Sequence, residues 1–204
     1  GADATELDVD ELDVYVAGIP LNASGSLRLC GADSTLVSAR AAIENCKLEE
    51  MLRNYADRFI DIAPSISTDG CLDAEFTAEG VLGGGRLPEM TACVSLPDAH
   101  ITYRPDTLSA FVNIDVDAKM SPQGVLDADI HEFNARLSGL KLDFDGDARD
   151  LTGADPRYRL SAEGFVKLDS IMRFLPASLG VSTASGKLDL ALSVNTRASE
   201  LKDF

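Results

Sequence analysis

Two histidines, His100 and His131, are the only side chains of this sequence whose ordinary pKa lies near neutrality. A serine or cysteine hydrolase would need one of them beside its nucleophile. Neither lies near a Gly-x-Ser-x-Gly segment or another nucleophile motif. We therefore predict that the chain is not an enzyme. A hydrolase that combines His131 with nearby acids is a competing hypothesis, which an unchanged phenotype of His131→Ala would remove.

Acidic residues gather in two short segments that resemble cation sites. In the first, Gly146 precedes the third acid instead of following it, and no Glu stands where a calcium loop would end. In both segments, acids alternate with apolar residues, as they do on the outward side of a strand. We therefore predict no metal site and no cofactor. The segments contain Asp143, Asp145, Asp147 and Asp150, and Asp127, Asp129, His131 and Glu132.

The four cysteines all lie in the first half of the chain, at Cys30, Cys46, Cys71 and Cys93. Their spacing gives none of the close pairs that are typical of zinc sites or thioredoxin-like motifs. Buried free thiols and ordinary disulfides both remain open, and four cysteines allow three pairings. Proximity favours a disulfide between Cys30 and Cys46.

The charge balance argues against a nucleic-acid partner. Lys and Arg total 18 against 34 Asp and Glu, a formal charge of −16, and no basic cluster interrupts the acidic pattern. The same charge opposes docking on an anionic bilayer surface. No apolar run is long enough for a membrane helix. Because the sequence opens with Gly1, Ala2 and Asp3 without Met, we expect an internal fragment whose anchor lies outside it.

Alternation of apolar and polar residues dominates the chain. Such alternation is typical of a sheet with one dry and one wet face. Turn residues separate the runs, which predicts a mainly β, antiparallel meander of roughly ten to twelve strands. A phase slip at Asp10 and Glu11 predicts a β-bulge. The apolar positions proposed to line a groove are Leu108, Ala110, Val112, Ile114, Val116, Met120, Leu142, Phe144, Leu188, Leu190 and Leu192.

Two segments break this alternation. Residues 47–59 and 167–180 carry apolar residues at helical spacing, so each predicts a short helix with one apolar side. Pro176 and Gly180 are expected to end the second helix.

The two predicted helices belong to an internal repeat of about 120 residues. We expect one domain over 1–204, with the first copy over about 7–120 and a truncated second copy over about 125–204. The matching segments are 18–21 with 139–142, Gly25 with Gly146, 38–39 with 161–162, 47–49 with 167–169, and 70–73 with 186–189.

A strand that leads into a short Leu-acid helix and then into a Gly-x-Leu-Asp strand resembles the AsmA-like proteins of Gram-negative envelopes. Residues 43–52 with 70–76, and 165–172 with 186–194, carry this resemblance. It implies a periplasmic body of repeated β units behind an inner-membrane anchor, related to the TamB-type bridge-like lipid transporters. It also implies a part in outer-membrane assembly and phospholipid traffic, and it supplies no catalytic residues.

These observations predict either an open groove for lipid acyl chains or a sandwich-like meander. Alternation alone does not separate a trough from a face that packs as an ordinary core under the helices. The alternative function is a structural or adhesion-type β-sandwich that binds through its surface. If a repeat array is cut at its ends, its outer strands should associate with other copies or with further repeats of the same chain.

Overall fold

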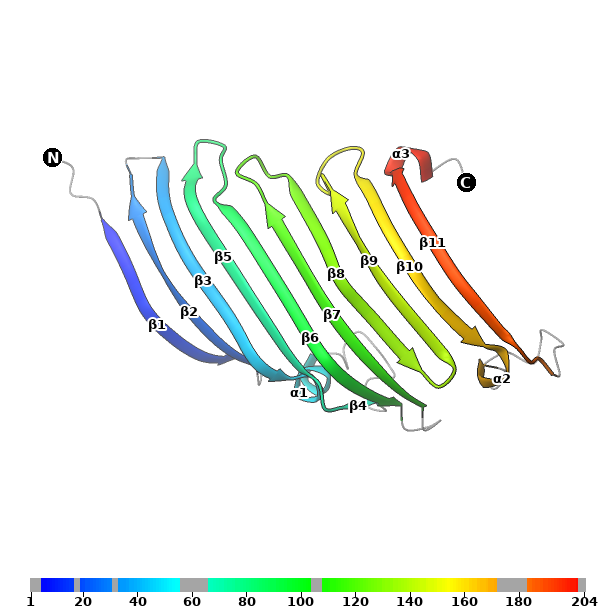
Figure 1. Cartoon of the computed structure of the whole chain (residues 1–204). Coiled ribbons are helices and arrows are strands. Elements are labelled where there is room, and N and C mark those ends of the chain that lie inside the picture. Colours follow the sequence, from blue (N-terminus) through cyan, green and yellow to red (C-terminus); the bar gives the residue numbers. More distant parts are fainter. Residues whose placement is uncertain are drawn as a thin grey trace.

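The computed structural model describes residues 5–16, 19–30, 33–55, 66–103, 108–171 and 183–201. Their strands form one antiparallel sheet (Figure 1). This confirms the predicted mainly β, curled meander. The strands are β1 (Glu6–Val16), β2 (Ile19–Leu29), β3 (Ser34–Lys47), β4 (Ile66–Thr68), β5 (Cys71–Gly83), β6 (Glu89–Tyr103), β7 (Leu108–Met120), β8 (Leu126–Leu137), β9 (Leu140–Arg149), β10 (Arg157–Lys167) and β11 (Lys187–Arg197).

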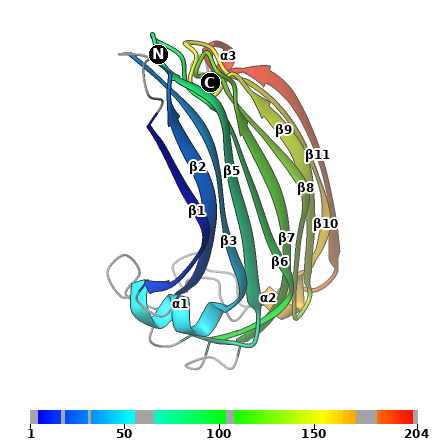
Figure 2. The same ribbon diagram turned by 90° about the vertical axis from the view of Figure 1, so that its left-hand side faces the viewer.

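The strands lie in the sheet in the order in which they follow along the chain. Only the short β4 departs from this order, because it pairs with the far half of β6. Tight connections favour this arrangement, since an antiparallel hairpin needs only a few linking residues. The described strands make one layer and not the two layers of a sandwich (Figure 2).

Three short helices lie at the ends of strands: α1 (Leu48–Tyr55), α2 (Leu168–Ile171) and α3 (Ala198–Leu201). The predicted helices over 47–59 and 167–180 begin within one residue of α1 and α2, and residues 56–59 and 172–180 lie outside the described residues. Figure 2 shows α1 inside the bend of the sheet. No helix in the described part of the chain has the length and apolarity that crossing a membrane requires.

Bulges bend the long strands at several points. The register between β1 and β2 shifts at Val9 and Leu12, which confirms the predicted bulge. In β3 and β6 the bulged residues Asn45 and Asp98 have φ of 51° and 47°, a region that Asn and Asp tolerate well.

The neighbouring strand compensates each of these two bulges. The N–H of Asn45 donates to Oδ1 of Asp73 at 2.7 Å, and the N–H of Asp98 donates to Oδ1 of Asn113 at 2.6 Å. A bulge frees a backbone donor from the ladder, so a side chain across the gap must accept it. These short polar side chains therefore help to set the curvature of the sheet.

The buried core is small and lies under α1. Leu48 of the helix is 8% exposed and packs with Leu96 and Ala99 of β6. Met51 and Leu52 of the helix are partly buried and pack against this cluster. The helix therefore covers one end of the sheet only, and most of the sheet face lies outside this core.

The two segments of the predicted repeat share several structural features. In both, two paired strands lead into a helix, and a later strand pairs with the second of them: β2, β3, α1 and β5 in the first segment, where β4 intervenes, and β9, β10, α2 and β11 in the second. The N–H of Leu48 donates to the carbonyl of Gly70, and the N–H of Leu168 donates to the carbonyl of Gly186, each at 2.9 Å. Gly25 lies opposite Ala39, as Gly146 lies opposite Leu160. These features favour the repeat, which stays a prediction.

The predicted disulfide between Cys30 and Cys46 is wrong, because all four cysteines are free. The N–H of Cys30 donates to the carbonyl of Ser34, where β3 begins. Cys46 is near the other end of that 14-residue strand, about 40 Å away. A disulfide requires Cα atoms within about 7 Å of each other. Cys30 and Cys46 are close in sequence, but the extended strand β3 between them carries them far apart in space.

Candidate functional site

The candidate site is one whole face of the sheet, which we call the apolar face. It is the side that carries Val112 in β7 and the residues that pairing places beside it, from Val9 in β1 to Leu192 in β11. Among the paired residues of the ten successive strands, no Asp, Glu, Lys or Arg lies on this side. The charges of the strands lie on the opposite side, which we call the polar face.

The apolar face is open along most of its extent. The chain exposes 13289 Å², whereas a compact monomer of 21.7 kDa exposes about 9,200 Å². Only six hydrophobic residues of the described chain are buried. The largest exposed fractions on this face belong to the edge strands, with Leu7 at 59% and Leu192 at 61%. The described residues thus leave the face largely without cover.

A hollow of about 570 Å³ lies in this face over β1 to β8. Its floor consists of small residues, because alanine and glycine leave space above the backbone where larger side chains would fill it. Larger apolar side chains surround the floor. The floor includes Ala23, Gly25, Ala39, Ala41, Ala78, Ala92 and Ala118, and the larger side chains are Leu7, Leu12, Leu27, Phe76, Met90, Met120 and Leu126.

Gly25 shows how the floor is built. A Cβ at this position would overlap the carbonyl oxygen of Ser38 and press on Ala39 in the adjacent strand. Only glycine therefore lets β2 and β3 approach here. Gly25 thus leaves space above the backbone in the lining of the hollow.

The structure places all the proposed groove residues on the apolar face. Their pairing across β7 to β11 follows the predicted alternation. Met120 also lines the hollow, whereas Ile114 packs against the core under α1. Leu108 is placed by its backbone pairing with Tyr103. The candidates thus share one face of the sheet, although most of them lie away from its hollow; their role as groove residues stays a prediction.

Sequence reasoning missed most of the hollow because its strands are rich in small residues. In β2 and β3, Ala, Gly and Ser occupy both sides of the strand, so the difference between apolar and polar positions is slight. The alternation of β6 and β7 shows clearly which of their residues share a face. Knowing the register would have extended this assignment to the alanines of the neighbouring strands.

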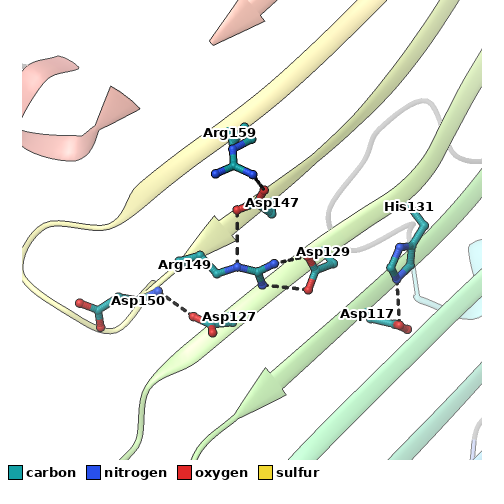
Figure 3. Close-up of polar contacts among 8 residues, drawn as sticks. All are labelled: Asp117, Asp127, Asp129, His131, Asp147, Arg149, Asp150 and Arg159. Carbon is teal, nitrogen blue, oxygen red and sulfur yellow. Dashed lines mark hydrogen bonds and ion pairs between the residues drawn. The ribbon is translucent and has the colours of Figure 1, made fainter. Parts of the chain in front are cut away.

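On the polar face, three side chains from adjacent strands meet around Asp117. His131 Nε2 lies 2.9 Å from Asp117 Oδ2 (Figure 3). This hydrogen bond raises the pKa of His131. A hydrogen bond with Cys93, followed by that with His131, holds the pKa of Asp117 below its ordinary value.

This arrangement does not prepare a nucleophile. The hydrogen bond to Asp117 raises the pKa of Cys93 to about 11, so the thiolate is strongly disfavoured at neutral pH. A cysteine nucleophile needs the opposite, a thiol beside a cation or a basic imidazole. The Asp117 carboxylate therefore favours the protonated forms of the Cys93 thiol and the His131 imidazole.

The two acidic segments of the sequence also lie on the polar face. Asp129 binds both terminal nitrogens of Arg149, and this hydrogen bonding lowers the pKa of the Asp129 carboxyl (Figure 3). Asp147 lies between Arg149 and Arg159, at 3.5 and 3.7 Å. Cations of the chain thus neutralise these acids. Among the described residues, no group of three or more His, Cys, Asp or Glu side chains is arranged to hold a metal ion.

The chain matches no family model, no curated protein and no solved structure.

Proposed function

We propose that the apolar face carries the acyl chains of lipids, as part of a non-enzymatic cell-envelope protein. The observation that supports this proposal is that the paired residues of the ten successive strands place no charged side chain on this open face. Monomeric soluble proteins rarely expose apolar patches larger than a few hundred Å² unless these bind something.

Energetics explain why such a face suits a carrier. Each CH₂ group taken out of water is worth about 0.8 kcal/mol, so exposing an acyl chain of ~14 such groups costs roughly 11 kcal/mol. A carrier must keep the chain covered. The face can do so along its length, since a strand of the size of β7 spans about 43 Å.

The shape of the hollow supports the same proposal. Its small floor residues and larger surrounding side chains form an apolar depression within the bend of the sheet. The alanines and the glycine of the floor carry no polar side-chain group that would fix one orientation. It therefore suits flexible hydrocarbon better than a ligand with many hydrogen-bonding groups.

The cellular setting is a further proposal. The AsmA-like resemblance supports a periplasmic location, an inner-membrane anchor, a part in outer-membrane biogenesis and additional repeats of this unit. The alternative, an adhesion-type sandwich, would fill the interior between two layers. It receives less support, because the described strands form one layer with few buried hydrophobic residues.

Photo-crosslinking from neighbouring residues would test the proposal. A photoreactive residue at Ala118 faces the hollow, whereas one at Lys119 in the same strand faces the opposite side. In a Gram-negative periplasm, we expect lipid adducts at Ala118 and none at Lys119. The pair Ala78 and Glu79 repeats the comparison in β5. Equal labelling on both faces, or no labelling on the apolar face, would contradict the proposal.

A charge in the floor gives a second measurement. Ala118→Asp should reduce the lipid that copurifies with the chain at least tenfold, because a carboxylate in contact with hydrocarbon is strongly disfavoured. Native mass spectrometry after gentle purification would quantify the lipid. Lys119→Asp is the matched control and should leave the bound lipid unchanged.

A further inference from the structure

The two edge strands of the sheet have the most exposed apolar residues of the apolar face. β1 lies beside β2 only and β11 beside β10 only, within the described sheet. Leu7 and Leu12 in β1 are 59% and 48% exposed, and Leu192 in β11 is 61% exposed. Edge strands that are long and apolar are templates for further strand pairing.

The even number of successive strands allows the two edges to pair with each other in the antiparallel sense. Ten strands lie in succession and alternate in direction, so β11 runs antiparallel to β1. If a second copy places its β1 beside β11 with its apolar face on the same side, the new pair is again antiparallel. It repeats the relationship of every neighbouring pair within the sheet.

One register matches the side chains of both edges. With Arg197 opposite Glu6, Thr196 lies opposite Leu7 and Val194 opposite Val9. The bulge of β1 at Asp10 and Glu11 then faces Ser193, as it faces Ser24 in the pairing with β2. Beyond the bulge, apolar residues again face apolar residues, since Leu192 meets Leu12 and Leu190 meets Val14. The bulge of β1 therefore preserves the match.

Two other pairings of the edges are symmetric, β1 with β1 and β11 with β11, and their charges differ from those of β11 with β1. At full or nearly full overlap of the strands, two β1 strands with their apolar sides together would place Asp8 opposite Asp13, and two β11 strands would place Lys187 opposite Arg197. Like charges directly opposite each other destabilise a sheet. The pairing of β11 with β1 places Arg197 opposite Glu6, and no like charges meet in this register.

We infer that β11 of one copy pairs antiparallel with β1 of a second copy, with Arg197 opposite Glu6, and that this pairing extends the apolar face from copy to copy. The contact is heterologous, so each added copy again presents a free β11 edge, and assembly leads to open chains. The inference does not depend on lipid, and its test is made without lipid.

Charge changes at Ala191 test the register directly. Ala191 is exposed, lies on the polar side of β11, and would meet Asp13 of the next copy. Sedimentation velocity should show a weight-average mass that rises with concentration. Ala191→Lys should strengthen this association a few-fold, and Ala191→Glu should weaken it by a similar factor. A mixture of Ala191→Glu with Asp13→Lys should restore it, because the two new charges then meet.

A lysine directed onto the apolar side of the edge should block association. Val194→Lys is this variant, and Leu36→Lys, on the polar side of β3 and 43% exposed, is the matched control. Circular dichroism verifies that each variant keeps its sheet. A monomer at all concentrations, a dimer that does not grow, or a mixture that fails to restore association would overturn the inference. Retained lipid adducts at Ala118 in such a case would leave the proposed function standing.

Discussion

At the scale of single residues, the polar face shows how a strongly acidic chain handles its charge. Asp117 accepts hydrogen bonds from Cys93 and His131, while Asp129 and Asp147 bind arginines of neighbouring strands. These contacts join strands across the surface of the sheet. Because the groups are exposed to solvent, each pair adds little stability. The register places Asp117, Asp129 and Asp147 side by side across β7, β8 and β9, so these contacts offset the repulsion between neighbouring carboxylates.

The His131–Asp117 pair predicts a pH dependence. The folded pKa of His131 is raised, so its stabilising effect is complete below its ordinary pKa of 6.5 and is lost as pH rises through the folded value. The pKa of Asp117 is lowered, so its effect is present above its ordinary pKa of 3.8 and is lost as pH falls through the folded value. An NMR titration of the imidazole should show a pKa above 6.5 that Asp117→Asn returns toward 6.5. A midpoint unaffected by that substitution would show that Asp117 does not hold the proton.

The same carboxylate controls the reactivity of Cys93. Asp117→Asn removes the charge that disfavours the thiolate, so we expect faster alkylation of Cys93 at pH 8. Mass spectrometry of partly alkylated protein measures the rate residue by residue. Cys30, which is also exposed and lies far from Asp117 in the sheet, is the internal control and should react at the same rate in both proteins. Parallel changes at both cysteines would point to a general loosening of the fold.

At the scale of elements, the alternation of the sequence predicted the strands, and the short turns predicted an antiparallel meander. The order of the strands in the sheet was not predicted and comes from the structure. The charged residues between Leu108 and Met120 made β7 unambiguous. The lengths of the helices and the hollow were not predictable to the same degree. The hollow depends on alanines from separate strands, which only the register brings together. The Cys30–Cys46 pairing failed because sequence spacing does not tell how far a strand carries its ends apart.

The contact of α1 with the sheet predicts the effect of Leu48→Ala. Leu48 is among the few buried large side chains, so its removal leaves a cavity in the only core cluster of the described residues. We expect the free energy of unfolding to fall by about 2–5 kcal/mol. Urea denaturation measures this change. Leu36→Ala, on the exposed polar side of β3, is the control and should cost less than about 0.5 kcal/mol. Equal losses would mean that α1 does not anchor the sheet.

At the scale of the whole molecule, the exposed area sets the protein apart from a compact domain. Apart from the small core under α1, the single layer buries its apolar residues only against neighbours within the sheet, so it relies on hydrogen bonds and cross-strand contacts more than on a core. The edges and the apolar face are consequences of the same architecture. The apolar face is proposed to bind lipid, and the edge strands are proposed to pair with a further strand. The two proposals therefore concern separate parts of one surface.

The meander has a kinetic consequence. Each strand from β6 to β11 pairs with the strand just before it in the chain, whereas β5 pairs with β3 and the short β4 pairs with β6. Contacts that are close in sequence form quickly, because little chain entropy is lost when they close. A chain delivered from its N-terminus can thus add one strand at a time to a growing template, and among the described strands only the short β4 waits for a partner made later.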